Sequence, residues 1–70
     1  MDRIEQLRSF LVQHPADLFS RHALAMEFIK RGDDASAKEL LESVLDIDPG
    51  YVGSYYHLGK LLERAGQADA

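Results

Sequence analysis

This 70-residue sequence repeats itself: when it is moved along until Pro15 falls on Pro49, much of the chain superposes on itself. This internal repetition limits its possible folds more than any other feature. The same shift, which we call the repeat shift, also superposes Gly32 and Gly66, Leu24 and Leu58, Ser20 and Ser54, Leu7 and Leu41, Ser9 and Ser43, and Leu11 and Leu45. Turn-forming and apolar residues therefore keep the same spacing in both copies. Such a period indicates a supersecondary unit that buries its apolar face by stacking on neighbouring units.

Apolar residues recur at intervals of three and four in four segments, which is the spacing of one helix face. The stripes expected to be buried are Ile4, Leu7, Phe10 and Leu11; Leu24, Ala25 and Phe28; Ala37, Leu40, Leu41, Val44 and Leu45; and Val52, Tyr55, Leu58, Gly59 and Leu62. No stretch of five residues alternates between polar and apolar as a strand does. The sequence thus predicts an all-α chain of four helices.

Aspartates and turn-forming residues mark where these helices should begin and end. The predicted N-caps are Asp2, Asp17 and the Asp33-Asp34 pair. Pro15 and Pro49 disfavour helical geometry in the residues before them, so the first and third helices should end there. Gly32 and Gly66 are expected to adopt the left-handed conformation that ends a helix, which closes the second and fourth helices.

At these positions the sequence resembles the tetratricopeptide repeat family, whose unit is a pair of helices with the same period as the repeat shift. Residues 18–51 supply the family's motif as Leu24-Ala25, Phe28, Gly32, Ala37, Leu41, Val44 and Pro49. Residues 1–17 resemble the second half of a preceding unit, and residues 52–70 resemble the first half of a further unit. The resemblance implies a single domain over residues 1–70, a fragment of a right-handed solenoid of antiparallel helix pairs. Arg21 departs from the family, which usually has tryptophan or another bulky apolar residue there.

The resemblance also implies how the helices of a pair pack. Ala25 and Gly59 are expected to be small because the paired helices approach closely there. Phe28 and Leu62 are expected to fill the space between them. Leu61 then falls on the outer face of the last helix. A plain four-helix bundle remains an alternative, because the same apolar stripes could serve it.

The composition excludes several classes of protein. Twelve Asp and Glu against eight Lys and Arg give a net charge of −4, which argues against a nucleic-acid binder with a basic face. The chain has no cysteine, which excludes disulfides and thiolate metal sites. Residues 1–14 are amphipathic without an unbroken apolar segment, so we expect no signal peptide, no membrane span and a cytoplasmic location.

In the repeat family, the first helix of each pair lines a concave groove that receives an extended peptide or a partner's helix. Carried over by position, the groove residues are Phe19, His22, Met26, Ile29, Lys30, Tyr56, His57, Lys60, Glu63 and Arg64. Helical spacing independently places four of them on one face, which gives this helix a second, largely apolar stripe: Phe19, His22, Met26 and Ile29. Two alternatives to a partner groove are that this stripe packs on the N-terminal helix, or that it is a self-association seam.

The sequence offers no catalytic constellation, and we expect neither enzyme activity nor a cofactor. His22 and His57 could both face the groove, but two histidines without a third ligand make a poor zinc site. The serines lack the local context that activates a nucleophile. Asp46 and Asp48 stand at a helix end before a proline, where turn formation explains them.

The sequence therefore predicts a non-catalytic protein–protein interaction module that binds a peptide or a partner helix. The affinity should be modest, because two first helices make only a short groove. One alternative is a self-associating assembly subunit, such as a homodimer. Another is a fragment of a longer repeat scaffold, since the last helix resembles the first half of a unit without its second half.

Overall fold

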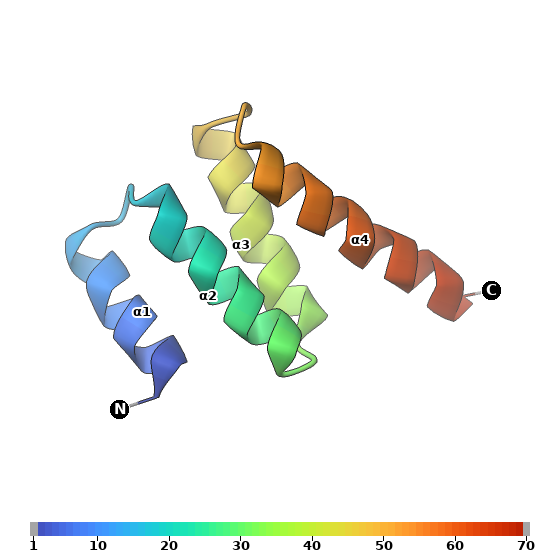
Figure 1. The fold of residues 1–70 in the computed structure, drawn as a ribbon, viewed down its shortest axis with the longest axis horizontal. Helices are drawn as coiled ribbons and strands as arrows, with labels where there is room; N and C mark the ends of the chain where they lie inside the picture. Colours follow the sequence, from blue (N-terminus) through green and yellow to red (C-terminus); the bar gives the residue numbers. More distant parts are fainter. Residues whose placement is uncertain (1, 70) are drawn as a thin grey trace.

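The computed structural model describes residues 2–69 and the side chains of residues 2–66. The described chain forms four helices, α1 (Arg3–Gln13), α2 (Leu18–Lys30), α3 (Asp34–Ile47) and α4 (Val52–Asp69), and contains no strand. Each helix runs antiparallel to the one before it, and the four follow one another across the molecule (Figure 1). The predicted all-α chain of four helices is therefore confirmed. None of these helices combines the length and the apolarity needed to cross a membrane.

The predicted aspartate caps are present at the first three helices. The carboxylate of Asp2 accepts a hydrogen bond from a backbone N–H of the first turn of α1, at 2.7 Å. Asp17 and Asp33 do the same for α2 and α3, at 3.4 and 3.2 Å, and each also accepts the hydroxyl of the serine three residues later, Ser20 or Ser36. These contacts satisfy N–H groups that a helix start leaves without a partner.

The two glycines predicted to end helices behave differently. Gly32 has φ +79°, and α2 stops just before it, as predicted. The prediction for Gly66 is wrong, because α4 continues through it to Asp69. Glycine permits the left-handed conformation without requiring it. The chain turns back into α3 directly after Gly32, whereas the residues after Gly66 continue along the same helix axis.

The hydrophobic core lies where α2 is flanked by α1 and α3. Its buried members are Ile4, Leu7, Leu24, Ala25, Phe28, Ala37, Leu41 and Leu61, with Leu11, Ala23, Met26, Ile29, Leu40 and Leu58 partly buried against them. The predicted stripes of the first three helices are thus largely confirmed. Phe10 is an exception, because it is exposed and stacks on His14 with ring centroids 4.4 Å apart.

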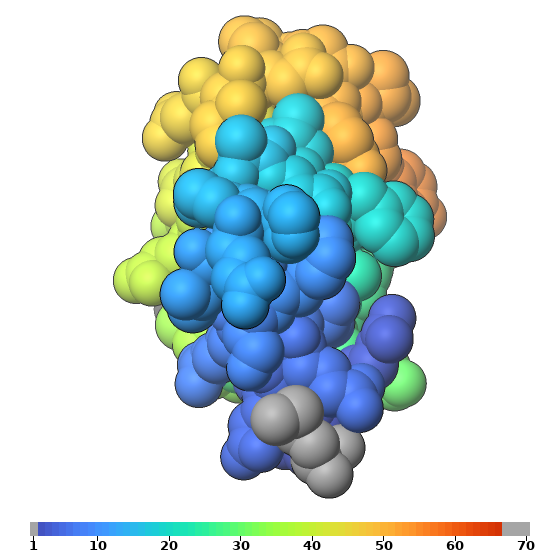
Figure 2. Space-filling model, turned by 90° about the vertical axis from the view of Figure 1, so that its left-hand side faces the viewer, coloured from blue at the N-terminus to red at the C-terminus, as the bar shows by residue number. Residues whose placement is uncertain are grey.

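The two ends of the helix row differ. Figure 2 views the molecule from the α1 side, where the side chains of α1 (blue) cover most of the face and the turn between α3 and α4 (yellow and orange) projects above them. On this side α1 covers α2. At the other end of the row lies α4, which packs on α3.

The helix face that α4 buries differs from the predicted one. Of the five positions expected to be buried, only Leu58 is partly buried against the core. The other four are exposed: Val52, Tyr55, Gly59 and Leu62. Instead Ser54 is fully buried, and Leu61 retains only 5% of its exposure, compared with 50% for Leu62. The expected outward position of Leu61 is therefore wrong. Residues 54, 58 and 61 also have helical spacing, and α3 lies on their side of α4, so tertiary packing selected this stripe over the other.

Candidate functional site

The helices α2 and α4 meet at a small polar and aromatic cluster. The rings of His22 on α2 and His57 on α4 have centroids 5.4 Å apart, in an edge-on arrangement. The Nδ1 atom of His22 lies 3.2 Å from the hydroxyl oxygen of Ser54, which is a hydrogen bond whichever atom carries the proton. The ring of Tyr51 lies 5.6 Å from His22 on another side. The structure therefore brings two of the predicted groove residues together.

Sequence reasoning did not select Tyr51, Gly53 or Ser54 for this place. At Gly53 an added Cβ would come within 3.5 Å of the His22 ring, so the first turn of α4 approaches this histidine closely. One signal for Ser54 was present, because the repeat shift superposes it on Ser20. Both serines are buried. The hydroxyl of Ser20 donates to Asp17 at the start of α2, and the hydroxyl of Ser54 is hydrogen-bonded to His22 on α2.

His22 is electrostatically biased toward its neutral form. Burial, and after it the nearby His57, lowers the pKa of His22 from its ordinary value. A base whose pKa is lower in the folded state binds fewer protons there than in the unfolded chain. Its contribution to stability is therefore complete above the ordinary histidine pKa and is lost as the pH falls below it.

Two exposed aromatic side chains are next to the histidines along their helices: Phe19 precedes His22 by one turn, and the Tyr56 ring lies 5.2 Å from that of His57. Phe19 on α2 is 71% exposed and Tyr56 on α4 is 62% exposed. The ammonium group of Lys60 lies 5.8 Å from the centre of the Tyr56 ring and 3.8 Å from a carboxylate oxygen of Glu63. Apolar, aromatic and charged groups thus share the surface beside the histidines.

The other predicted groove residues have different surroundings. Met26 and Ile29 are half-buried and pack against the core, as the core alternative expected of them. Lys30 is exposed, with its ammonium group 3.6 Å from Glu27. Arg64 directs two nitrogens at the carboxylate of Asp34 on α3, at 2.9 and 3.0 Å.

The cluster offers little for catalysis. Ser54 is fully buried, so a substrate cannot reach its hydroxyl. Within the described residues, His22 has no hydrogen-bonded carboxylate to orient it as the base of a nucleophile. No group of three His, Cys, Asp or Glu side chains among those residues could hold a metal ion. What the arrangement can do is present a mixed surface to another molecule.

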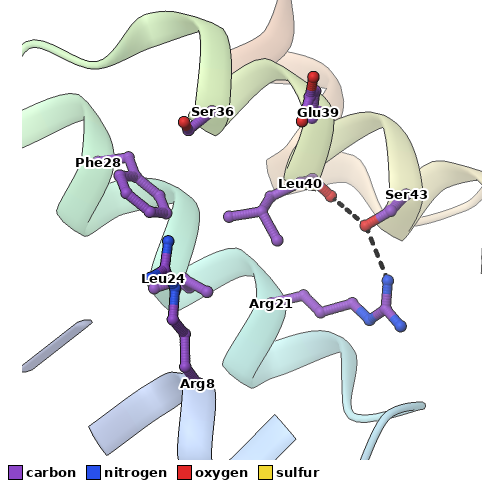
Figure 3. Close-up of a pocket in the computed structure, with 8 residues that line it drawn as sticks. All are labelled: Arg8, Arg21, Leu24, Phe28, Ser36, Glu39, Leu40 and Ser43. Atoms are coloured by element: carbon purple, nitrogen blue, oxygen red, sulfur yellow. Dashed lines mark hydrogen bonds between the residues drawn. The ribbon is translucent and has the colours of Figure 1, made fainter. Parts of the chain in front are cut away.

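A hollow of about 320 Å³ lies between α1, α2 and α3, on a different side of α2 from the histidine cluster (Figure 3). Its floor is formed by Leu24, Phe28 and Leu40, and the guanidinium of Arg8 lies 5.4 Å from the centre of the Phe28 ring. The remaining lining residues are Arg21, Ser36, Glu39 and Ser43. This floor is the edge of the hydrophobic core, so the hollow is where α1 and α3 diverge over α2.

Arg21, the residue that departs from the repeat motif, forms one wall of this hollow. Two of its nitrogens donate to the carbonyl oxygen of Pro15, at 2.6 and 2.9 Å, and the third donates to the hydroxyl of Ser43, at 3.0 Å (Figure 3 shows the second partner). Ser43 in turn donates to the carbonyl of Leu40. The guanidinium therefore links the turn after α1 to α3, and each of its three nitrogens makes one hydrogen bond within the fold.

Compared with known proteins, the chain matches no protein-family model, no curated protein and no solved structure. Its function must therefore be inferred from its own residues. Among those residues, the surface between α2 and α4 combines exposed aromatic side chains with charged groups. The hollow beside α1 combines an apolar floor with Arg21, which is hydrogen-bonded to Pro15 and Ser43, and Arg8, which lies over the Phe28 ring.

Proposed function

We propose that this chain is a tetratricopeptide-like helical repeat that binds a segment of another protein without catalysis. Three features support the repeat: the repeat shift of the sequence, the antiparallel order of the helices and the burial of motif positions. The buried motif positions are Leu24, Ala25, Phe28, Ala37, Leu41 and Val44. In such a repeat, the small residue at position 25 lets α2 and α3 approach and Phe28 fills the space between them.

The binding surface is the groove between α2 and α4. The observation that carries this proposal is the exposure of Phe19, one helical turn before His22 on α2, and of Tyr56, whose ring lies against His57 on α4. Large aromatic side chains are common anchors of protein interfaces, because they bury much apolar area with few rotatable bonds. A single exposed aromatic is unremarkable, but two that stand next to the contacting histidines of two different helices favour a binding surface.

The charges of the groove indicate the chemistry of the bound segment. The ion pairs of Lys60 with Glu63 and of Lys30 with Glu27 are surface contacts at 3.8 and 3.6 Å, and such pairs contribute little. An incoming carboxylate can therefore take either lysine at small cost. We expect the ligand to be an extended segment with an apolar or aromatic residue near an acidic one.

The groove consists of only two helices, which limits its affinity. We expect a dissociation constant in the micromolar range, roughly −8 kcal/mol or weaker. The histidine contact is preformed in the unbound chain, which reduces the entropy lost on binding. A nanomolar affinity for a short peptide would contradict a groove of this size.

The test is selection of a random peptide library on the immobilised chain, followed by titration of the best peptide. The expected result is enrichment of acidic residues beside apolar ones. The double variant Phe19→Ser, Tyr56→Ser should weaken binding at least tenfold, because both side chains are exposed and their loss leaves the core intact. Met26 and Ile29 are poorer targets, since they pack against the core.

The matched control is Val12→Ser, which removes an exposed apolar side chain from α1, away from the groove. This variant should bind the selected peptide as the wild type does. Equal binding by the double variant and the wild type would refute the groove, and a library without any enrichment would refute peptide binding itself.

A further inference from the structure

One face of α4 is apolar and exposed in the described structure. It consists of Val52, Tyr55, Gly59, Leu62 and Gly66, and we name it the α4 seam. These positions follow intervals of three and four along the helix, which is the spacing of a seam between two packed helices. Val52 is 77% exposed, Tyr55 53% and Leu62 50%.

No contact among the described residues explains the two glycines of the seam. Both lie inside α4, where glycine is among the poorest helix formers. Apart from their own helical turns, no described atom lies within 4 Å of the place a Cβ would take at Gly59 or Gly66. Neither has the positive φ that explains Gly32. Small residues at regular positions of a helix face instead allow a second helix to approach closely.

The internal repetition shows what kind of neighbour such a face receives. The repeat shift superposes Gly59 on Ala25 and Leu62 on Phe28. Ala25 is fully buried and Phe28 nearly so, in the core shared with α3. The equivalent face of α4 has the same small-then-large pattern and lacks a described helix against it. The occupant should therefore be a helix.

We propose that this occupant is the α4 helix of a second copy, packed antiparallel about a two-fold axis through Gly59. In that arrangement Gly59 meets the partner's Gly59, Tyr55 meets the partner's Leu62, and Val52 meets the partner's Gly66. Val52 thus faces a glycine and Tyr55 faces a leucine, and the two glycines on the axis allow the helices to approach closely. A two-fold interface must be self-complementary in this sense.

The charges beside the seam have the same symmetry. Tyr56, Lys60 and Glu63 follow the seam along one edge, and Lys60 and Glu63 are both more than half exposed. Antiparallel packing about Gly59 brings Glu63 of one copy toward the Tyr56 hydroxyl and the Lys60 ammonium group of the other. Opposite charges beside an apolar seam favour this orientation. A parallel pair would instead place the two Glu63 carboxylates at the same level.

The alternative within this chain is that α1 of another copy occupies the seam. The outer side of α1 fits poorly, because Phe10 is already stacked on His14 and Arg3 lies 3.7 Å from Glu27. Pairing α4 with α1 would also be head-to-tail, which does not close and would produce an open series of copies. The closed two-fold pair uses the more apolar surface on both sides.

The seam is short, so the dimer should be weak. At about 1.5 Å per residue, the seam spans roughly 21 Å, which places the interface at the small end of specific contacts. We expect a dissociation constant on the order of 10 µM. Sedimentation equilibrium from well below to well above that concentration should show a monomer that becomes a dimer and nothing larger.

The discriminating variant is Gly59→Gln. Glutamine is a better helix former than glycine and meets open space in the single chain, so the monomer should fold at least as well. On the two-fold axis, two glutamine side chains would separate the helices. The dissociation constant should rise at least tenfold. The matched control is Phe10→Ser on α1, which should leave dimerisation unchanged.

Cysteine cross-linking tests the orientation, because the chain has no cysteine of its own. An oxidised mixture of Tyr55→Cys and Leu62→Cys should form mostly the mixed disulfide, since only antiparallel packing brings these positions within bridging distance. Homodisulfides at both positions would indicate a parallel pair and overturn the proposal.

Three sedimentation results would also overturn it. These are a monomer at every concentration, a dimer that Gly59→Gln leaves intact, and a growing series of species that Phe10→Ser abolishes. The last would assign the seam to α1 of the next copy. The proposed peptide groove shares Tyr56, Lys60 and Glu63 with the edge of the seam. Gly59→Gln keeps all three side chains while weakening the dimer, so peptide titration of this variant tests that function separately.

Discussion

Replacing Leu61 by alanine should destabilise the fold far more than the same replacement at Leu62. These neighbours have identical side chains and lie in the same helix, so helix propensity contributes equally to both changes. Leu61 is 5% exposed and belongs to the core, whereas Leu62 is 50% exposed. The pair therefore measures which face of α4 packs on α3.

The magnitudes follow from these exposures. Truncating a buried leucine costs about 2–5 kcal/mol, so we take about 3 kcal/mol for Leu61→Ala. Leu62→Ala should cost about 1 kcal/mol or less, because the side chain is already half in water. A 70-residue chain has a total stability of roughly 3.5–10 kcal/mol. Leu61→Ala should thus remove a large part of it, which lowers Tm by about 12–24 °C, against at most about 8 °C for Leu62→Ala.

The assay is thermal and urea unfolding followed by far-UV circular dichroism. The protein concentration should be about 1 µM, below the dissociation constant expected for the dimer, so that a second copy does not cover Leu62. An equal or larger loss of stability in Leu62→Ala would refute the reasoning. It would mean that α4 is rotated about its axis and that its other stripe faces α3.

Two further predictions concern Arg21 and His22. Arg21→Met should cost about 1–3 kcal/mol of unfolding free energy, because it removes the charged hydrogen bonds to Pro15 and Ser43. Arg8→Met should cost less than about 1 kcal/mol. Urea midpoints compare the two variants, and equal losses of stability would contradict a bridging role for Arg21. The lowered pKa of His22 means that the unfolded chain binds more protons than the folded one, so stability should fall as the pH drops below about 6.5. Urea midpoints between about pH 5 and pH 7.5 should show this fall in the wild type and a flatter profile in His22→Gln; the same slope in both would exclude His22 as its source.

Local signals made the helix boundaries predictable. Asp17 and Asp33 cap their helices through their own side chains, and Gly32 ends α2 in the left-handed conformation. Each of these devices depends on a few consecutive residues, so the sequence alone specifies it. Gly66 shows the limit of this reasoning, because a glycine ends a helix only where the chain also turns.

The buried face of α4 was not predictable in the same way. Two helical stripes share Leu58 on α4. One continues through Ser54 and Leu61 and the other through Tyr55 and Leu62, and helical spacing describes both equally well. The repeat motif favours the second, while the position of α3 selects the first. Which stripe is buried depends on where the neighbouring helix lies, and no local signal carries that information.

The candidate site was only partly predictable, again because the position of the neighbouring helix is not a local signal. Carrying the groove over by position identified His22 and His57, because the resemblance to the repeat family assigns both to the first helix of a pair. It did not identify Ser54, which bonds His22 from the buried side of α4. The sequence predicted that the Tyr55 and Leu62 side of α4 is buried, so it gave no reason to expect Ser54 beside His22. The role of Arg21 was also hidden, because both of its partners lie outside α2.

The two apolar sides of α4 connect the groove with the seam. A helix that is apolar on two sides is normally buried on two sides, and α2, which lies between α1 and α3, is an example in this chain. Pairing through the α4 seam would give α4 its second neighbour and leave the α2 side of both grooves accessible in one particle, because only Tyr56, Lys60 and Glu63 are shared with the edge of the contact. A partner that carries two copies of the recognised segment would then bind the second groove intramolecularly. The effective concentration for that step is in the millimolar range for short linkers, far above a micromolar dissociation constant. Two weak grooves joined by a weak seam can therefore hold a bivalent partner much more tightly than either groove holds a single segment.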